Sequence, residues 1–114
     1  MYNITDQLNK KIVLIYRNMI LNTDGDTVLG IAVGDCLFNS RSVVFGKIIR
    51  STAYDLKGEI IGRAVLANPA LNFNITQEQL KQAWNILSNI TEHTCPWIQM
   101  SEEWALHSFA DHLA

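Results

Sequence analysis

The chain has 114 residues and a formal net charge of −2; 48% of its residues are hydrophobic and 18% are charged. This balance excludes a disordered chain, and the length suits one domain with its own core. The 9 Lys and Arg residues are scattered, which argues against binding to nucleic acid or to an anionic membrane, and no apolar stretch is long enough to cross a bilayer. The first residues lack the pattern of a secretory signal, so we expect a single domain over residues 1–114 in the cytoplasm.

One unit occurs twice, in residues 15–33 and 48–65. Equivalent residues lie 32 or 33 positions apart, as in the pairs Arg17 and Arg50, and Gly30 and Gly62. In each copy a turn sequence with a glycine separates apolar runs that are rich in β-branched residues, a pattern typical of a β-hairpin. We therefore expect two hairpins related by a pseudo-twofold axis, with Gly30 and Gly62 at a bulge, a bend or a close backbone approach.

The two turn sequences are Asn22–Asp26 and Asp55–Glu59. The run Asp24-Gly25-Asp26 also invites a calcium-loop interpretation. The second copy, however, has Lys57 in place of Asp24, and no glutamate follows at the required spacing. We interpret both as ordinary turns.

The remaining strands follow from the apolar runs. Residues 5–9 are compatible with a single helical turn, and the four strands are expected at about 11–21, 28–33, 43–54 and 59–67, with Cys36-Leu37-Phe38 as a short edge strand. Asn68-Pro69 ends the last strand, because proline cannot continue a hydrogen-bonded ladder. The run Ile12–Tyr16 is apolar on both alternating faces, so both faces of the sheet must be covered.

A helix is predicted at 76–92. It begins with the capping box Thr76–Gln79, and its expected core stripe is Leu80, Ala83, Trp84, Leu87 and Ile90. A second helix is predicted at 101–113, capped by Ser101, with its core stripe at Leu106, Phe109, Ala110 and Leu113. The side chains expected opposite that stripe are Trp104, His107 and Asp111.

These elements predict an α+β domain: an antiparallel sheet or small half-open barrel of two repeated β-hairpins, followed by two C-terminal helices packed on it. Two helices can cover one face of the sheet. The other face would be buried in a small closed barrel or in a homodimer, and the low charge favours the homodimer.

Metal binding and catalysis find little support. The zinc-binding residue types near the end of the chain are His93, Cys95, His107, Asp111 and His112, but their spacing does not place two ligands on one helix face. Cys95 beside His93 lacks an oxyanion-hole sequence, and without a secretory signal we expect Cys36 and Cys95 to be reduced. We expect no metal, no cofactor and no catalytic residue.

Arg17 and Arg50 are the other candidates, as equivalent residues among apolar neighbours in strands. They could converge on an anion, or each could pair with Asp26 or Glu59 across its own hairpin, and the local pairing is favoured.

The segment Gly46–Gly62 resembles the hairpins of small bacterial barrels such as the PRC-barrel, a resemblance that covers this segment alone and assigns the chain to no family. The favoured function is a small protein-binding or self-associating module without catalytic activity, with Trp104, His107 and Asp111 as interface candidates. Two alternatives remain open: a ligand-binding protein or enzyme with a pocket between sheet and helices, where His107 or Arg50 supplies polarity, and an inhibitor or immunity-type protein.

Overall fold

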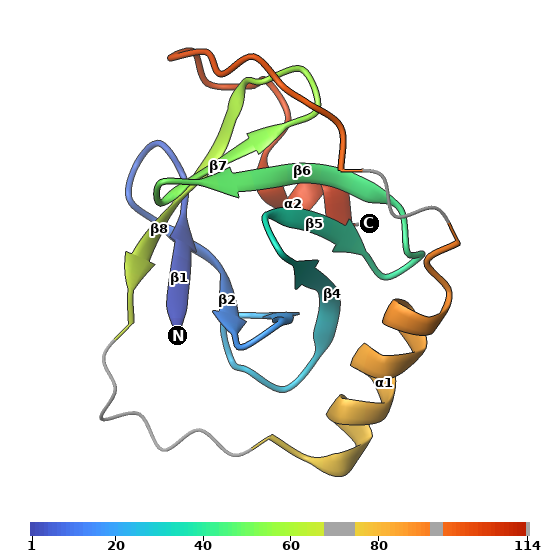
Figure 1. Cartoon of the computed structure of the whole chain (residues 1–114). Helices are drawn as coiled ribbons and strands as arrows, with labels where there is room; N and C mark the ends of the chain where they lie inside the picture. The colour runs from blue at the N-terminus through green and yellow to red at the C-terminus, as the bar shows by residue number, and fades with distance from the viewer. Residues whose placement is uncertain (68–74, 92–94, 114) are drawn as a thin grey trace.

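The computed structural model describes residues 1–67, 75–91 and 95–113. Its centre is a closed antiparallel barrel in which strands β1 to β8 follow one another around the wall in sequence order (Figure 1). The strand bounds are β1 Tyr2–Thr5, β2 Lys11–Tyr16, β3 Met19–Leu21, β4 Val28–Val33, β5 Cys36–Asn39, β6 Val44–Ile49, β7 Thr52–Asp55 and β8 Ile60–Leu66.

The barrel is closed, not half-open as the sequence suggested, because β8 pairs with β1 along four residue pairs from Tyr2↔Leu66 to Thr5↔Arg63. Residues 2–5 therefore supply the strand that joins the two ends of the sheet, and residues 6–9 form a turn of the barrel and not a helical turn. Closure buries one face of every strand inside the barrel, which accounts for half of the apolar pattern without a second copy of the chain.

Each copy of the sequence repeat contains three strands and not one hairpin. The predicted strand over 43–54 is broken into β6 and β7 at Arg50 and Ser51, and the strand over 11–21 is broken into β2 and β3 after Arg17. Arg17 and Arg50 lie in these tight turns with φ of 56° and 49°. The placement of both arginines in strands was wrong, because neither turn contains the glycine that would have marked it in the sequence.

The opposite ends of the strands are joined by four equivalent loops that begin at Asp6, Asn22, Asn39 and Asp55. In each loop the first residue accepts two backbone N–H donors on its side-chain oxygen, as in Asp55, whose Oδ1 accepts from Lys57 and Glu59 at 2.9 and 3.0 Å. Three positions later each loop has a residue at positive φ, namely Asn9, Gly25, Ser42 and Gly58. The barrel thus consists of four consecutive hairpins, and the unit that occurs twice in the sequence is itself made of two similar halves.

The strand glycines reflect the same repetition, since Gly30, Gly46 and Gly62 are spaced sixteen residues apart. A Cβ atom at Gly30 would overlap the carbonyl oxygen of Phe38, and one at Gly46 would overlap that of Tyr54. The expectation of a close backbone approach is therefore confirmed at Gly30, and Gly46 belongs to the same set, whereas a Cβ atom at Gly62 would overlap the side chain of Ile4.

Two apolar cores lie on the two sides of the barrel wall. The inner core contains buried side chains from every hairpin and from the C-terminal residues, namely Ile4, Val13, Ile15, Ile20, Leu37, Phe45, Ala53, Ile61, Phe109 and Leu113. The outer core lies on the side of β3, β4 and β5 and contains Leu14, Met19, Leu21, Val28, Ile31, Cys36, Phe38, Ala67 and Ile86.

Helix α1, Gln77–Ser88, covers the outer core beside β4 (Figure 1). The predicted capping box is confirmed: Thr76 accepts from the backbone N–H of Gln79, and the Gln79 side chain accepts from that of Thr76. The predicted core stripe is wrong in large part, because the fully buried residues of α1 are Gln79 and Ile86, whereas Trp84 is 66% exposed.

Helix α2, Phe109–Leu113, is much shorter than the predicted helix at 101–113. Residues 101–105 run beside the start of β8 instead: the backbone N–H of Ile60 donates to Glu103, and that of Ala105 donates to Ile60. Phe109 and Leu113 are buried as predicted, while Leu106 is fully exposed. The short helix closes the loop end of the barrel, where the side-chain amide of Asn39 donates to the carbonyl of His112.

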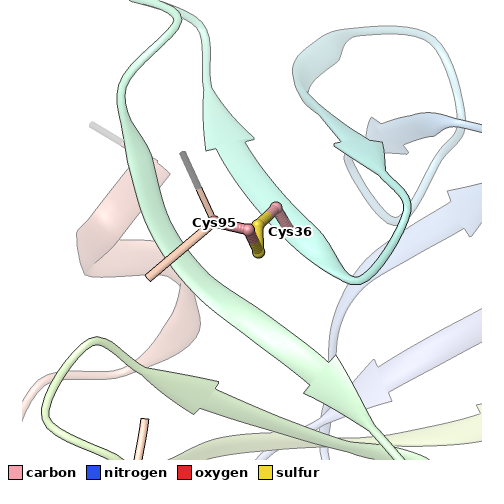
Figure 2. Close-up of a disulfide and its surroundings, with 2 residues drawn as sticks. All are labelled: Cys36 and Cys95. Carbon is pink, nitrogen blue, oxygen red and sulfur yellow. A yellow bond between two sulfur atoms is a disulfide. The ribbon is translucent and has the colours of Figure 1, made fainter. Parts of the chain in front are cut away.

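A disulfide joins Cys36 on β5 to Cys95 (Figure 2). The expectation of two reduced thiols was wrong, since the fold places the two Cα atoms 5.9 Å apart although 59 positions separate them in sequence. The bond ties the chain that follows α1 to the barrel wall.

Candidate functional site

The predicted interface residues lie near the C-terminus, and they do not share one helix. Trp104 is half-buried and forms the bridge to Ile60, with the guanidinium of Arg63 5.6 Å from its ring centre. Trp104 therefore contacts another part of the fold, and its assignment to an interface stays a prediction.

His107 and Asp111 are exposed, with 4.0 Å between Nδ1 of His107 and Oδ2 of Asp111. The same carboxylate accepts from the backbone N–H of Ser108 just before α2, so it also caps that short helix. A surface pair of this kind contributes little to stability. The hollow beside His107 is small, about 150 Å³, and Trp104 lies on its wall.

The other candidates are separated by the fold. Cys95 is held in the disulfide and is therefore no nucleophile, and His93 lies outside the described residues. His112 stacks on Phe45, and its Nε2 is buried and has no hydrogen-bond partner within the described part of the chain. Among residues 1–67, 75–91 and 95–113, no group of three His, Cys, Asp or Glu side chains is arranged to hold a metal ion.

Arg17 and Arg50 do not form the expected pairs with Asp26 and Glu59. The strands place both arginines at one end of the barrel and both carboxylates at the other, which rules out the pairing geometrically. The Arg17 guanidinium lies 5.4 Å from the ring centre of Tyr16. Both arginines remain exposed to solvent.

The largest change from the predicted arrangement is the orientation of α1. Gln79 points at the barrel and donates through Nε2 to the carbonyl of Gly25 at 2.8 Å. Near the other end of the helix, the hydroxyl of Ser42 donates to the carbonyl of Ile86 at 2.6 Å. These two bonds to different loops fix the rotation of the helix about its axis, so that a polar residue faces inward and three large apolar residues face outward.

The outward residues are Leu80, Trp84 and Leu87, which are 50%, 66% and 40% exposed. Together with the outer surface of β3 and β4 they form a hollow of about 310 Å³, here named the α1 groove. It is lined by Arg17, Asn18, Met19, Ile31, Val33, Leu80, Ala83, Trp84 and Leu87. The predicted pocket between sheet and helix thus exists, but neither His107 nor Arg50 lines it.

The charged residues around the α1 groove are basic. Arg17 lies at the end nearer the β2–β3 turn, and Lys81 lines a second hollow that continues along Leu80 and Trp84. No carboxylate of the described residues lines either hollow, although the chain as a whole carries a net charge of −2. The groove is therefore an apolar surface with a locally positive border.

Sequence reasoning assigned Leu80, Trp84 and Leu87 to the core and therefore missed this surface. One sequence feature was informative: Gln79 is part of the capping box, and a capping side chain faces the chain that enters the helix. The side of the helix that faces the barrel, however, depends on contacts with loops that are distant in sequence.

Comparison of the chain with models of protein families, with curated proteins and with solved structures finds no match. In the part of the chain that the structure describes, no helix is long and apolar enough to cross a membrane.

Proposed function

We propose that the protein is a binding module that holds an acidic, amphipathic segment of another protein in the α1 groove. The observation that carries the proposal is the exposed row Leu80, Trp84 and Leu87 above an apolar hollow. Tryptophan is among the residues that most often dominate binding energy at protein interfaces. An apolar patch bordered by charges is the usual form of such a surface.

The shape of the groove favours a helical partner. One wall is the side of a helix and the floor is the outer surface of β3 and β4, so an apolar stripe with spacings of three and four residues can lie along it. The basic border formed by Arg17 and Lys81 selects acidic residues beside that stripe.

The same border disfavours a second copy of this chain as the occupant. In a symmetric dimer through the groove, each Arg17 and Lys81 would approach the basic residues of the other copy. An inhibitor or immunity-type protein would use the groove in the same way and would differ only in the identity of its partner.

The test uses two synthetic helical peptides with the same leucine stripe, one flanked by glutamates and one by lysines. We expect the acidic peptide to bind at least about tenfold more tightly at low salt, with the preference falling as salt screens the border. Trp84→Ala should weaken binding about 30-fold, as expected of a residue that anchors an interface. Trp97→Ala is the matched control, because Trp97 is 82% exposed and does not line the groove.

Light scattering of the free protein completes the test. A monomer mass near 12.9 kDa is expected. A dimer that Trp84→Ala dissociates would show that a second copy fills the groove, and equal binding of both peptides would contradict the charge selection.

A further inference from the structure

Helix α1 lies beside β4 with its most apolar side turned away from the barrel (Figure 1). The buried residues Gln79 and Ile86 lie on one line along the helix, about 20° apart, because successive residues are about 100° apart around the axis. The exposed residues Leu87, Leu80 and Trp84, here named the apolar row, lie about 80°, 100° and 140° from Gln79. The apolar row therefore begins beside the buried line and continues into the solvent.

The α1 groove is the space that this orientation leaves between the apolar row and the barrel. Ala83 lies between the buried line and the apolar row, and it lines the groove. On the barrel side the groove is lined by Met19, Ile31 and Val33 of β3 and β4, here named the groove floor. Both sides of the groove are apolar, so a roll of α1 about its axis would place the apolar row on the groove floor and remove both from water.

Two hydrogen bonds oppose this roll. Nε2 of Gln79 donates to the carbonyl of Gly25 at 2.8 Å, and the hydroxyl of Ser42 donates to the carbonyl of Ile86 at 2.6 Å. They hold the same side of the helix, near its two ends. A single hydrogen bond stabilises one arrangement only modestly, whereas burial of three large apolar side chains favours the other arrangement. The orientation of α1 is therefore a balance between a few polar contacts and a larger apolar surface.

We propose that α1 is an autoinhibitory element that exchanges between the open orientation described above and a closed orientation in which the apolar row covers the groove floor. The spacing of the apolar row is that of a helix that lies across a sheet, so the α1 sequence also suits the closed orientation. A partner binds the open orientation alone, and the fraction of open molecules then sets the apparent affinity. This inference rests on the function proposed for the α1 groove and adds its regulation, but the roll itself is measurable without a partner.

Two variants remove the hydrogen bonds that hold the open orientation. Gln79→Glu keeps the acceptor that the capping box needs but has no N–H for the carbonyl of Gly25, so a carboxylate would face that carbonyl. Ser42→Ala removes the other bond and adds no charge. The matched control is Gln82→Glu, which makes the first substitution at an exposed position of the same helix.

The orientation of α1 is read from the NMR signal of the Trp84 indole N–H, which is assigned by comparison with Trp84→Phe. In the unmodified protein and in the control variant we expect a water-soluble paramagnetic probe to broaden this signal. In Gln79→Glu and Ser42→Ala the signal should be protected and should show nuclear Overhauser contacts to the methyl groups of the groove floor. An indole that stays exposed in both variants, whether or not α1 remains helical, would overturn the proposal.

Binding of the acidic leucine-stripe peptide gives the functional result. We expect Gln79→Glu to weaken binding about tenfold and Ser42→Ala about threefold, because the peptide must then select a less populated open orientation. The control Gln82→Glu should change binding by less than about twofold, since it adds only a surface charge. Unchanged binding by variants in which Trp84 is protected would overturn the autoinhibition. If the unmodified protein binds neither peptide, the function proposed for the groove fails, whereas a protected Trp84 in the two variants would still support the two orientations.

Discussion

Phe45 on β6 and Phe109 on α2 meet edge to face inside the barrel, with ring centroids 5.3 Å apart and ring planes at 90°. Phe109 has no exposed surface, and it is the first residue of a helix of only five residues. Such a short helix has little stability of its own, so the packing of this ring holds the C-terminal segment in the barrel.

Phe109→Ala should lower the free energy of unfolding by about 3–5 kcal/mol, because it removes a fully buried ring and leaves a cavity in the inner core. Urea unfolding followed by circular dichroism measures the change. Leu106→Ala is the control: Leu106 is fully exposed three residues earlier, and its loss should change stability by less than about 0.5 kcal/mol. Equal effects of the two substitutions would contradict the role of Phe109 in holding the C-terminal segment in the barrel.

The disulfide should be a major source of stability. It closes a segment with a sequence separation of 59, so replacing both Cys36 and Cys95 by serine should cost up to about 4 kcal/mol by releasing chain entropy in the unfolded state. Chemical denaturation of the oxidised protein and of the double variant gives the difference. Addition of a reducing agent should bring the unmodified protein to the stability of the double variant. Thiol titration that finds two free cysteines in the oxidised protein would contradict the bond.

The four equivalent loops allow a substitution test within the repeat. Asp55 is buried, and its Oδ1 accepts from two backbone N–H groups, a role that asparagine fills at Asn22 and Asn39. Asp55→Asn should therefore be nearly neutral, whereas Asp55→Ala should cost about 1–3 kcal/mol because two backbone N–H donors in a partly buried loop lose their acceptor. Thermal unfolding of the two variants decides the matter. A large loss with Asn would mean that the negative charge of Asp55 matters beyond its hydrogen bonds.

Asp26 should titrate at low pH. Hydrogen bonds from the Asn22 amide at 2.6 Å and from the Thr27 hydroxyl at 3.0 Å stabilise its carboxylate and hold its pKa below the usual value of 3.8. A carboxyl whose pKa is lower in the folded than in the unfolded state stabilises the fold above the unfolded pKa, and this contribution is lost as the pH falls through the folded pKa. Carbon-detected NMR should find the midpoint of Asp26 below 3.8. Asn22→Ala, which removes the main donor, should raise it, and a midpoint at or above 3.8 in the unmodified protein would contradict this.

The sequence by itself determined the local features whose causes are local. The glycine-containing turns at 22–26 and 55–59, the capping box at Thr76 and the close backbone approach at Gly30 were all predicted, because each depends on the backbone preferences of a few adjacent residues. The repeat of 32 or 33 residues was also visible. The division of this repeat into four hairpins was not visible in the sequence, because the turns at Arg17 and Arg50 have residues other than glycine at positive φ.

Only the tertiary structure decided which faces are buried. The periodicity of α1 showed that the helix is amphipathic, but hydrogen bonds from Gln79 to the loop at Gly25 and from Ser42 to Ile86 turned its most apolar side to the solvent. The approach of Cys36 to Cys95 and the burial of Phe109 likewise depend on contacts between residues far apart in the chain. The sequence pattern shows which residues are apolar. Closure of the barrel decides which of these residues are buried inside it and which lie on its outer surface, and for that reason the proposed binding surface was found only in the folded chain.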